Sequence, residues 1–568
     1  MINQPIKWNR RIPNQIISLT VAVCLFAGTA AAATPPPDSG AALQSVKQPE
    51  NQPPAATAPG AITINEPETA PPSGNQQKIR VNGFRLSGET IVPEQELLQL
   101  IADQAGLDLT LGDLNGLAAR ITKYLRQKGY LVASAYLPAQ QVKDGIVTIA
   151  VIPGKYGEMK INNQAHIQTA RLEAILTILQ PETIITRQSL ERALLLLNDL
   201  AGVQAKVTLT PGRKPGTADL IVAASDTAKI NGNANADNWG SRYTGQTRGG
   251  VQVNLNNLAQ LGDALNLSGL TTGNGMSNGG FDYAIPLFNS GLKLDLKYSH
   301  VNYALGADFA DLGASGTAAV YGAGLSYPLI RSRNFNLYGS FGFDGKQLKD
   351  VVGNSTNTPR TSSLWNIGIA GNAADAWGNG GLTSFSLTYS AGNLTINDSN
   401  AAAQDASSAN TAGRFQKLGL SGSRRQFFAS NFNLDLLFSG QLAGKNLDSS
   451  EKFYLGGADG VRAYPQGEAA GDQGFRLTME LQAQLVTAAP QSSVNLALFS
   501  DYGYVTVNRN PWDGSVNTRS LCDAGLGVIF TTTGFTIRCD YAWKIGAATA
   551  TSDTDQPGRF WVRAVKSF

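Results

Sequence analysis

The sequence is poor in the residues from which metal sites and many catalytic sites are built. Its 568 residues include two His and three Cys, which leaves almost nothing for a zinc site or a Cys–His catalytic pair. Gly-rich stretches such as residues 456–457 lack the Lys-Ser/Thr pair of a phosphate-binding loop. The sequence therefore predicts no enzyme, no catalytic residues, no metal and no cofactor.

Charge is scarce as well, and so are long hydrophobic runs. Charged residues make up 15% of the chain, against about 25% in an ordinary soluble domain. The net charge of +3 gives no support for nucleic-acid binding. A mean hydropathy of -0.13 excludes a bundle of membrane helices, each of which needs about 20 apolar residues. Gly is abundant instead, with 61 residues, so the chain is large, polar and Gly-rich.

The amino terminus has the pattern of a secretory signal peptide over residues 1–33. Lys7, Arg10 and Arg11 precede an apolar stretch, residues 16–33, which ends in four alanines. A basic region, a short apolar core and small residues at its end are typical of such a peptide. A membrane anchor is the alternative, but the apolar core is short and no charged residue stops it on the far side. We therefore expect an exported protein.

Residues 34–77 hold ten of the 25 prolines, interspersed with Ala, Gln, Asn and Ser. Such a composition does not repay the entropy of ordering the chain, and no amphipathic period is visible in it. The sequence predicts a disordered or extended Pro-rich linker here.

Two small α/β modules follow, at residues 78–153 and 154–226. Each shows the order β-α-α-β-β, with helical faces at three- and four-residue spacing and a closing hairpin. Repetition of one order over about 75 residues indicates an internal repeat. His166 stands alone, without a catalytic partner. Open edge strands in such modules suit peptide capture by strand addition; the alternative is that they are mere spacers.

Residues 229–568 alternate apolar with polar positions in segments of about ten residues, as in residues 292–298, 432–438 and 475–481. This alternation is typical of a transmembrane antiparallel β-barrel; the soluble alternative is a secreted β-sandwich or β-helix. Short turns, as at 531–534, alternate with long connections, which are expected at 304–316, 348–361, 395–413, 446–473, 506–518 and 546–558. The pattern predicts about sixteen strands, ending at the aromatic Phe568, and a barrel wide enough for an aqueous channel.

The longest of these loops contains Leu-Gly-Gly-Ala-Asp-Gly-Val-Arg-Ala-Tyr at residues 455–464. It resembles the V-R-G-Y/F motif of the superfamily that unites barrel-assembly proteins with two-partner secretion transporters, and the β-α-α-β-β modules resemble its POTRA domains. Residues 129–138, 215–220 and 238–245 look like the hemolysin secretion/activation branch (TpsB type). The resemblance covers roughly residues 78–568.

The resemblance also singles out a pair of sites, the loop motif and one barrel strand. In the strand at 494–505, Val494, Leu496 and Leu498 share the lipid-facing phase, so the alternate residues face the lumen. A lumenal carboxylate needs a partner, and a guanidinium matches it in a bidentate way. The loop motif is Val461, Arg462, Ala463 and Tyr464, and its lumenal partner is the F-x-D-x-G pattern Phe499, Asp501 and Gly503.

The expected contact joins Arg462 to Asp501. The alternative is that Arg462 is a solvated loop residue and Asp501 merely lines a wet pore. The sequence departs from the family at Ala463, where Gly is usual, so an altered turn is expected. In some relatives a helix before the POTRA domains plugs the pore, and the Pro-rich linker does not show one.

The resemblance implies an outer-membrane translocator with POTRA domains in the periplasm. These would capture an unfolded, secreted exoprotein, hemolysin- or adhesin-like and β-helical, and export it through a monomeric, lipid-embedded barrel. The alternatives are an insertase for outer-membrane β-proteins and a passive porin. Identity of the cargo, gating state and pairing of Cys522 with Cys539 stay open, although simple hairpin register sets the two thiols too far apart for a bridge.

Overall fold

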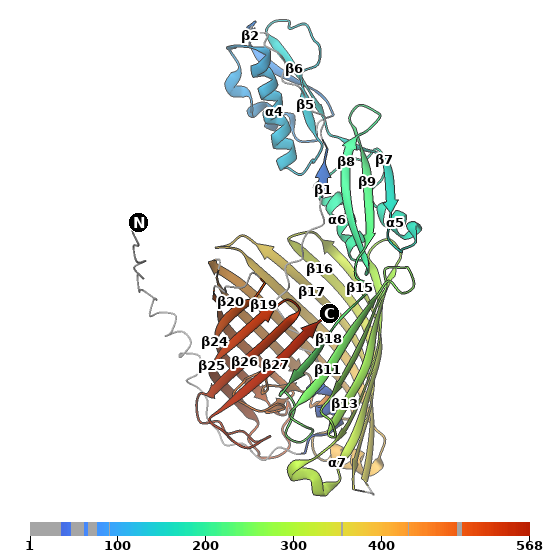
Figure 1. Cartoon of the computed structure of the whole chain (residues 1–568), viewed down its shortest axis with the longest axis vertical. Helices are drawn as coiled ribbons and strands as arrows, with labels where there is room; N and C mark the ends of the chain where they lie inside the picture. The colour runs from blue at the N-terminus through green and yellow to red at the C-terminus, as the bar shows by residue number, and fades with distance from the viewer. Residues whose placement is uncertain are drawn as a thin grey trace, which may run out of the picture.

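The computed structural model describes residues 36–46, 62–65, 77–89, 91–353, 356–429, 431–485 and 491–568. The signal peptide expected at 1–33 lies outside these ranges. In the described part of the chain, two α/β modules follow one another at one end of a large barrel (Figure 1). Within the same ranges, no helix has the length and apolar character needed to cross a membrane.

The first module folds around a three-stranded sheet in the order β3-β6-β5, with β3 parallel to β6. The helix α4 covers this sheet and begins with a capping box, in which Thr110 and Asp113 bond each other's backbone N–H groups. Its elements are β2 (Ile79–Val81), β3 (Gly83–Gly88), α3 (Glu94–Gln99), β4 (Leu107–Leu109), α4 (Leu111–Gln127), β5 (Ser134–Tyr136) and β6 (Ile146–Ile152).

The second module repeats the β-α-α-β-β order of the first module without its two additional short strands, β2 and β4. Leu194 and Leu197 of its second helix lie in a core shared with both sheet strands β8 and β9. Its elements are β7 (Lys155–Asn163), α5 (Thr169–Leu176), α6 (Arg187–Asn198), β8 (Val203–Pro211) and β9 (Thr217–Asp226).

The predicted barrel is confirmed: among the described residues, 16 antiparallel strands form a closed ring in which β10 pairs with β27. Sequence neighbours pair throughout, which is the up-and-down arrangement of outer-membrane barrels. The strands are β10 (Ile230–Asp237), β11 (Arg248–Asn256), β12 (Ala264–Thr271), β13 (Met276–Leu287), β14 (Leu292–Ala304), β15 (Ser315–Arg331), β16 (Phe335–Val352), β17 (Thr356–Asp375), β18 (Gly381–Ile396), β19 (Gly413–Ala429), β20 (Phe432–Ala443), β23 (Gln473–Leu485), β24 (Ser493–Thr506), β25 (Thr518–Thr532), β26 (Phe535–Lys544) and β27 (Gly558–Ser567).

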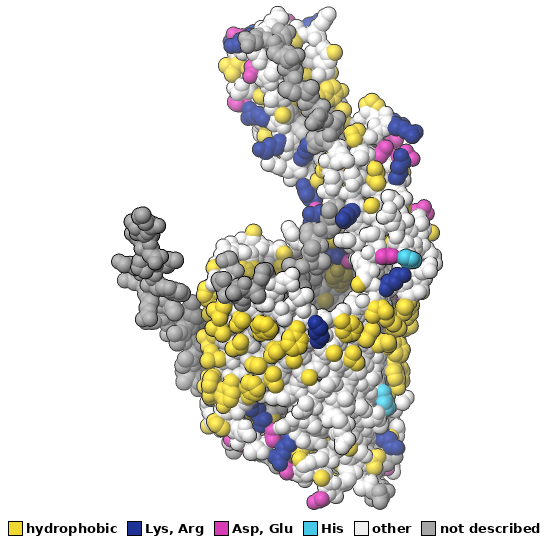
Figure 2. Space-filling model, viewed as in Figure 1, with side chains coloured by type: hydrophobic (Ala, Val, Ile, Leu, Met, Phe, Trp, Pro, Cys, Tyr) yellow, Lys and Arg dark blue, Asp and Glu magenta, His cyan; other side chains and the backbone are white. Residues whose placement is uncertain are grey.

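Alternation along the strands separates a lipid face from a lumenal face. In β24, Leu496 and Leu498 are 44% and 54% exposed, whereas Ala497 and Phe499 are 3% and 1% exposed. Figure 2 shows the outward hydrophobic side chains as a band across the barrel wall. Such a band is what a barrel needs to lie in a bilayer.

The connections that lie away from the modules are mostly long and carry short helices. They include η2 (Ala307–Leu312) and α7 (Ser399–Ala406). The long connection expected at 348–361 is wrong: β16 and β17 stay paired out to Val352 and Thr356. Polar residues continue the ladder there because the two strands extend beyond the apolar band, where alternation no longer marks a strand.

The prediction of a disordered or extended linker at 34–77 is wrong for residues 39–46, which are helical, whereas residues 62–64 are extended. Residues Ser39–Val46 form the helix α2, which lies inside the barrel, and Ile62–Ile64 form the strand β1 on the second module. Asp38 caps α2 by accepting the N–H of Ala41 at 2.9 Å. A helix of eight residues is marginal by itself, so contacts with the barrel decide its conformation.

The second module is fixed to the barrel at the turns that face it. The guanidinium of Arg331, at the end of β15, donates to both carboxylate oxygens of Asp199 at 2.7 and 2.9 Å. Arg333 pairs with Glu191 of α6 at 3.1 Å. These ion pairs orient the edge of the second module relative to the mouth of the barrel.

Candidate functional site in the barrel lumen

The connection between β20 and β23, residues 444–472, folds back into the lumen. Leu455, Val461 and Tyr464 of this loop are fully buried in a cluster that includes Phe499 of β24 and Ala542 of β26. The loop turns tightly on itself, since the N–H of Val461 donates to the carbonyl of Leu455 at 2.8 Å. We call residues 444–472 the lumenal loop.

Arg462, at the tip of the lumenal loop, makes a bidentate contact with Asp501 of β24. Its Nε lies 2.7 Å from Oδ2 and its Nη2 lies 3.1 Å from Oδ1. The two side chains are 5% and 0% exposed. The structure thus brings together the two residues that the sequence paired, in the geometry that makes guanidinium–carboxylate contacts strong.

Arg462 also contacts carboxylates that the sequence analysis did not single out. Its Nη1 donates to Glu480 of β23 at 2.9 Å and lies 3.5 Å from Asp540 of β26. Arg538 of β26 bridges the same two acids, with both distances at 2.7 Å. Two guanidinium groups therefore lie among three carboxylates, so each of these buried charges has an opposite charge beside it, which lowers the cost of burying it.

The aromatic and glycine positions of the β24 pattern shape the space around Arg462. Its Cζ lies 3.3 Å from the centroid of the Phe499 ring, a stacked cation–π contact. A Cβ on Gly503 would lie 2.7 Å from Leu455 and 3.2 Å from Val461. Gly503 therefore lets the lumenal loop approach the wall closely enough for Arg462 to reach Asp501.

Further hydrogen bonds, from backbone and side-chain groups, hold the motif residues in place. The N–H of Ala463 donates to Asp523 of β25 at 2.7 Å, and the hydroxyl of Tyr464 donates to the carbonyl of Ala548 at 3.1 Å. Trp561 donates to the carbonyl of Arg462 at 2.6 Å. Ala463 keeps negative φ, so alanine fits the position where the family usually has Gly and the altered turn expected there is not needed.

The amino-terminal end of α2 is held by a second charged cluster. Ser39 donates its N–H and hydroxyl to Asp350 of β16 at 2.7 and 2.9 Å. Arg360 of β17 donates to Asp38 at 3.0 Å and to Asp350 at 2.6 Å, and it also pairs with Asp448 of the lumenal loop. Arg360 thus joins the helix, the wall and the lumenal loop.

The lumenal loop itself is held to the wall beside α2. Its 3-10 turn η3 (Ser449–Glu451) ends at Glu451, and the carboxylate of Glu451 pairs with Lys346 and, at 2.9 Å, with Lys417. Burial alone would raise the pKa of the Glu451 carboxyl, but these two ammonium groups outweigh burial and bring the pKa to about 2. Glu451 therefore stays ionised and attached at physiological pH.

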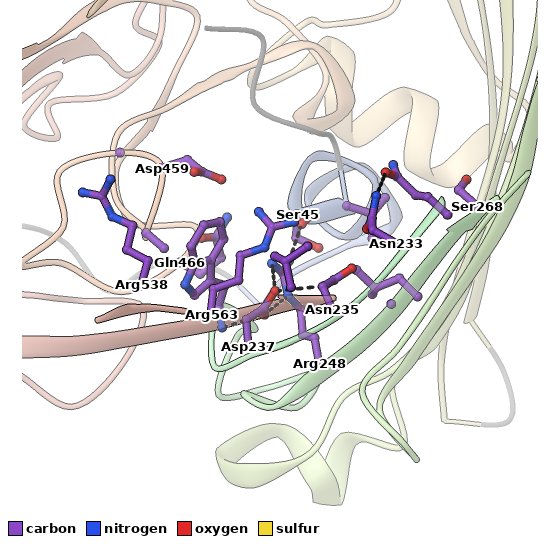
Figure 3. A pocket seen from close by; sticks show the side chains of 18 of the residues that line it. Ser45, Asn233, Asn235, Asp237, Arg248, Ser268, Asp459, Gln466, Arg538 and Arg563 are labelled. Atoms are coloured by element: carbon purple, nitrogen blue, oxygen red, sulfur yellow. Dashed lines mark hydrogen bonds and ion pairs between the residues drawn. The ribbon is translucent and has the colours of Figure 1, made fainter. Parts of the chain in front are cut away.

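The carboxyl-terminal end of α2 lies against the first barrel strands, as Figure 3 shows. Arg248 of β11 donates to the carbonyl of Ser45 at 3.2 Å and forms a bidentate pair with Asp237 of β10 at 2.7 and 3.2 Å. A guanidinium at the last carbonyls of a helix is a favourable cap. Both ends of α2 are thus fixed by arginines of the barrel wall.

Together, α2 and the lumenal loop divide the lumen. Cavities of about 1110 and 1260 Å³ lie in the part of the chain that the structure describes, and they share Leu43 and Ser45 of α2 and Asp459 and Gln466 of the loop as walls. The lumen is therefore partly filled by two segments that polar side chains hold in place.

The question of a disulfide within the hairpin of β25 and β26 has a clear structural answer. Cys539 is a free thiol and lies opposite Val528, away from the position of Cys522 on β25. Cys522 and Cys539 do not bridge each other.

A sixteen-stranded barrel with α/β modules at one end and an arginine-bearing loop folded into its lumen defines the class of outer-membrane proteins that join POTRA domains to a barrel. A POTRA domain of the ShlB type matches residues 79–154, and the model of the haemolysin secretion/activation protein ShlB/FhaC/HecB matches residues 216–528, more than half of the chain. The chain belongs to this family. It is an outer-membrane transporter of two-partner secretion, with its POTRA domains in the periplasm.

Individual relatives agree with this assignment. The chain is 28% identical over 550 residues to the heme/hemopexin transporter protein HuxB of Haemophilus influenzae, covering 94% of this chain and 95% of HuxB. It is 22% identical over 476 residues to the outer membrane transporter CdiB of Dickeya dadantii, covering 81% and 82% of the two chains. The solved structure of CdiB from Escherichia coli matches with a TM-score of 0.68 at 18% identity, over 89% of this chain and 93% of that one, which shows a shared fold.

The Arg462–Asp501 contact makes a first prediction. Asp501→Ala should reproduce much of the export defect of Arg462→Ala, and the double variant should be no worse than the more damaging single variant. In a double-mutant cycle of this kind, residues in direct contact show a coupling free energy of about 0.5–3 kcal/mol. Export of the exoprotein is measured at matched barrel levels. Strictly additive defects would mean that the contact does not matter for export.

Proposed function

We propose that the POTRA modules capture an unfolded exoprotein in the periplasm and that it crosses the outer membrane through the barrel lumen. The carrying observation is that α2 and the lumenal loop lie inside the lumen, where ion pairs and hydrogen bonds hold them. When such a segment moves out of the lumen, water can replace its ion pairs and hydrogen bonds. A core of packed wall side chains could not move aside in this way. A gated conduit accounts for both segments, and a passive porin leaves the modules unexplained.

The exoprotein we propose is a hemolysin- or adhesin-like chain that folds into a β-helix outside the cell. Since the sequence carries no phosphate-binding loop, folding on the outer side is the proposed source of free energy. One barrel encloses the lumen, so we propose that a single chain is the working unit. An insertase for β-proteins is the second candidate, favoured by the likeness to BamA of Haemophilus ducreyi, with a TM-score of 0.52 at 14% identity.

Where a gene for a large secreted protein adjoins the gene of this chain, co-expression of the two proteins tests the proposal. We expect that protein in the medium only when the transporter is present, with the assembly of other outer-membrane barrels unchanged. Loss of unrelated barrels from the membrane in cells without the chain, and no effect on the secreted protein, would favour the insertase.

The position of α2 inside the lumen leads to a second prediction. Arg360→Ala removes the side chain that joins Asp38, Asp350 and the lumenal loop, so α2 should leave the lumen more often and conductance in planar bilayers should rise several-fold. Arg424→Ala is the matched control, because its partner Asp375 belongs to neither blocking segment. Equal conductance of the two variants would contradict a block by α2.

A further inference from the structure

The connection between the last two strands, residues 545–557, lies against the lumenal loop. It joins β26 to β27 at the end of the barrel away from the modules (Figure 1). Ala548 of this connection is 8% exposed and belongs to the same apolar cluster as Leu455 and Val461 of the loop. We call residues 545–557 the outer connection. The lumenal loop therefore packs against two surfaces, the barrel wall and the outer connection.

Glu468, on the returning arm of the lumenal loop, directs its carboxylate at the outer connection. The side chain is 0% exposed and pairs with Arg519 of β25 at 2.5 Å. One carboxylate oxygen accepts the N–H and the hydroxyl of Thr551 at 3.0 and 2.8 Å. The other accepts the N–H and the hydroxyl of Ser552 at 2.7 and 2.5 Å. Since a carboxylate offers about four acceptor positions, these contacts occupy all of them.

These partners also keep Glu468 ionised. Burial raises the pKa of its carboxyl group, but the charge of Arg519 and the hydrogen bonds from Ser552 and Thr551 outweigh burial and bring the pKa below its ordinary value. The ion pair and the hydrogen bonds of Glu468 therefore persist at neutral pH.

The backbone of Glu468 supports the turn that leads to Arg462. Its carbonyl accepts the N–H of Gly456 at 3.0 Å, and the N–H of Val461 donates across the same turn to the carbonyl of Leu455 at 2.8 Å. A Cβ on Gly456 would lie 2.6 Å from the Cβ of Glu468, so the two arms of the loop touch here. The side chain and backbone of one residue therefore join the outer connection to the arm that carries Arg462.

The rest of the outer connection is fixed to the ends of the neighbouring strands. Asp553 pairs with Arg559 of β27 at 2.9 Å, and Asp555 pairs with Lys544 of β26. Arg519 donates to the carbonyl of Thr549 at 2.8 Å as well as contacting Glu468. The middle of the outer connection, residues 548–552, is thus shared between the lumenal loop and Arg519.

A second buried carboxylate of the lumenal loop holds a different connection. Asp472 is 0% exposed, pairs with Lys452 at 2.6 Å and accepts the N–H of Arg509 at 2.8 Å. Arg509 belongs to the connection between β24 and β25. Asp472 and Glu468 are therefore alike in burial and pairing but differ in the connection that each one holds.

We propose that Glu468 is a positioning residue for export, which links the lumenal loop to residues 548–552 so that the two move as one unit. Moving the loop alone takes the donors of Thr551 and Ser552 away from a buried carboxylate, which is costly, whereas a joint movement keeps them. Because Ser552 lines the cavity of about 1260 Å³, a displacement of the loop then also widens the outer end of the lumen. The link stands on these contacts, and its meaning for export rests on the proposed function.

Hydrogen–deuterium exchange of the full chain in detergent micelles tests the link, because the N–H groups of Thr551 and Ser552 donate to Glu468. We expect exchange at these two residues to be at least ten-fold faster in Glu468→Ala than in wild type, and intermediate in Glu468→Gln, which keeps an acceptor without the charge. Asp472→Ala is the matched control and should speed exchange at Arg509 instead. Unchanged exchange in Glu468→Ala, or equal acceleration by Asp472→Ala, would overturn the proposal.

Joint movement is tested by releasing the tip of the loop while Glu468 stays in place. Arg462→Ala should speed exchange at residues 551–552 at least five-fold, although the side chain of Arg462 contacts Asp501 and Glu480 rather than the outer connection. Thr551→Val/Ser552→Ala leaves every buried charge paired, so it folds as wild type, and it should weaken this response. Exchange at residues 551–552 that does not respond to Arg462→Ala would refute joint movement.

Secretion measures what the link does for export. Secreted exoprotein, at matched barrel levels, should fall at least ten-fold in Glu468→Ala and less in Glu468→Gln, because the outer connection no longer follows the lumenal loop. Wild-type export by Glu468→Ala would refute the role of Glu468 and leave the proposed function intact, since wild type reports on that function in the same assay.

Discussion

Replacing Arg462 by alanine is expected to lower export of the exoprotein at least 100-fold while the barrel still inserts. The change removes the guanidinium that contacts Asp501 and Glu480 and leaves both carboxylates buried beside Asp540. Breaking a buried ion pair by removing one partner costs about 3–5 kcal/mol. The barrel wall keeps its hydrogen-bond ladder, so the loss is expected in the position of the lumenal loop. Secreted exoprotein is measured by immunoblot of the medium at matched barrel levels.

Two variants make this result specific. Arg462→Lys keeps the charge but not the planar fork, so it should restore export only in part. Arg425→Ala is the matched control, since Arg425 also makes a bidentate pair, at 2.7 and 2.7 Å, with Asp435 of the neighbouring strand but touches no residue of the lumenal loop in these contacts. Export at the wild-type level by Arg462→Ala would show that the loop does not depend on this anchor.

Deleting residues 78–224 is expected to abolish export altogether, with the barrel still inserted. The barrel closes through its own strands, from β10 to β27, and the second module meets it through surface pairs such as Asp199 with Arg331. Removing the modules therefore takes away the proposed capture surfaces and leaves the hydrogen-bonded ring intact. The shift in electrophoretic mobility on heating measures barrel folding, and immunoblotting of the medium measures export.

A smaller deletion divides the roles of the two modules. Removing residues 78–152 takes away the first module, whose edge strand β5 is capped by Thr122, and keeps β8 and its bound β1. Export should then fall less than in the larger deletion. Undiminished secretion by the chain without residues 78–224 would mean that the periplasmic modules play no part in capture.

The barrel and the lumenal residues of β24 could be predicted from the sequence, because the alternation of apolar and polar residues along a strand is a local property. Leu496 and Leu498 mark the lipid face of β24, and that fixes Phe499, Asp501 and Gly503 toward the lumen. The same alternation in β23 and β26 places Glu480 and Asp540 inside as well. Their contact with Arg462 was missed because alternation gives the direction of a side chain and not its height in the barrel, which depends on the register between strands.

The sequence by itself determined the elements whose signal repeats along the chain: the sixteen strands, the β-α-α-β-β order and the inward face of Asp501. Tertiary structure alone decided the position of α2 and β1, because eight residues do not make a stable isolated helix and three do not make a strand. Asp38 and Ile62 acquire their conformations from Arg360 and from the edge of β8, which lie far away in sequence. Short segments in a Pro-rich stretch carry too little local free energy to specify a structure, and only the surfaces of the folded barrel and module supply the rest.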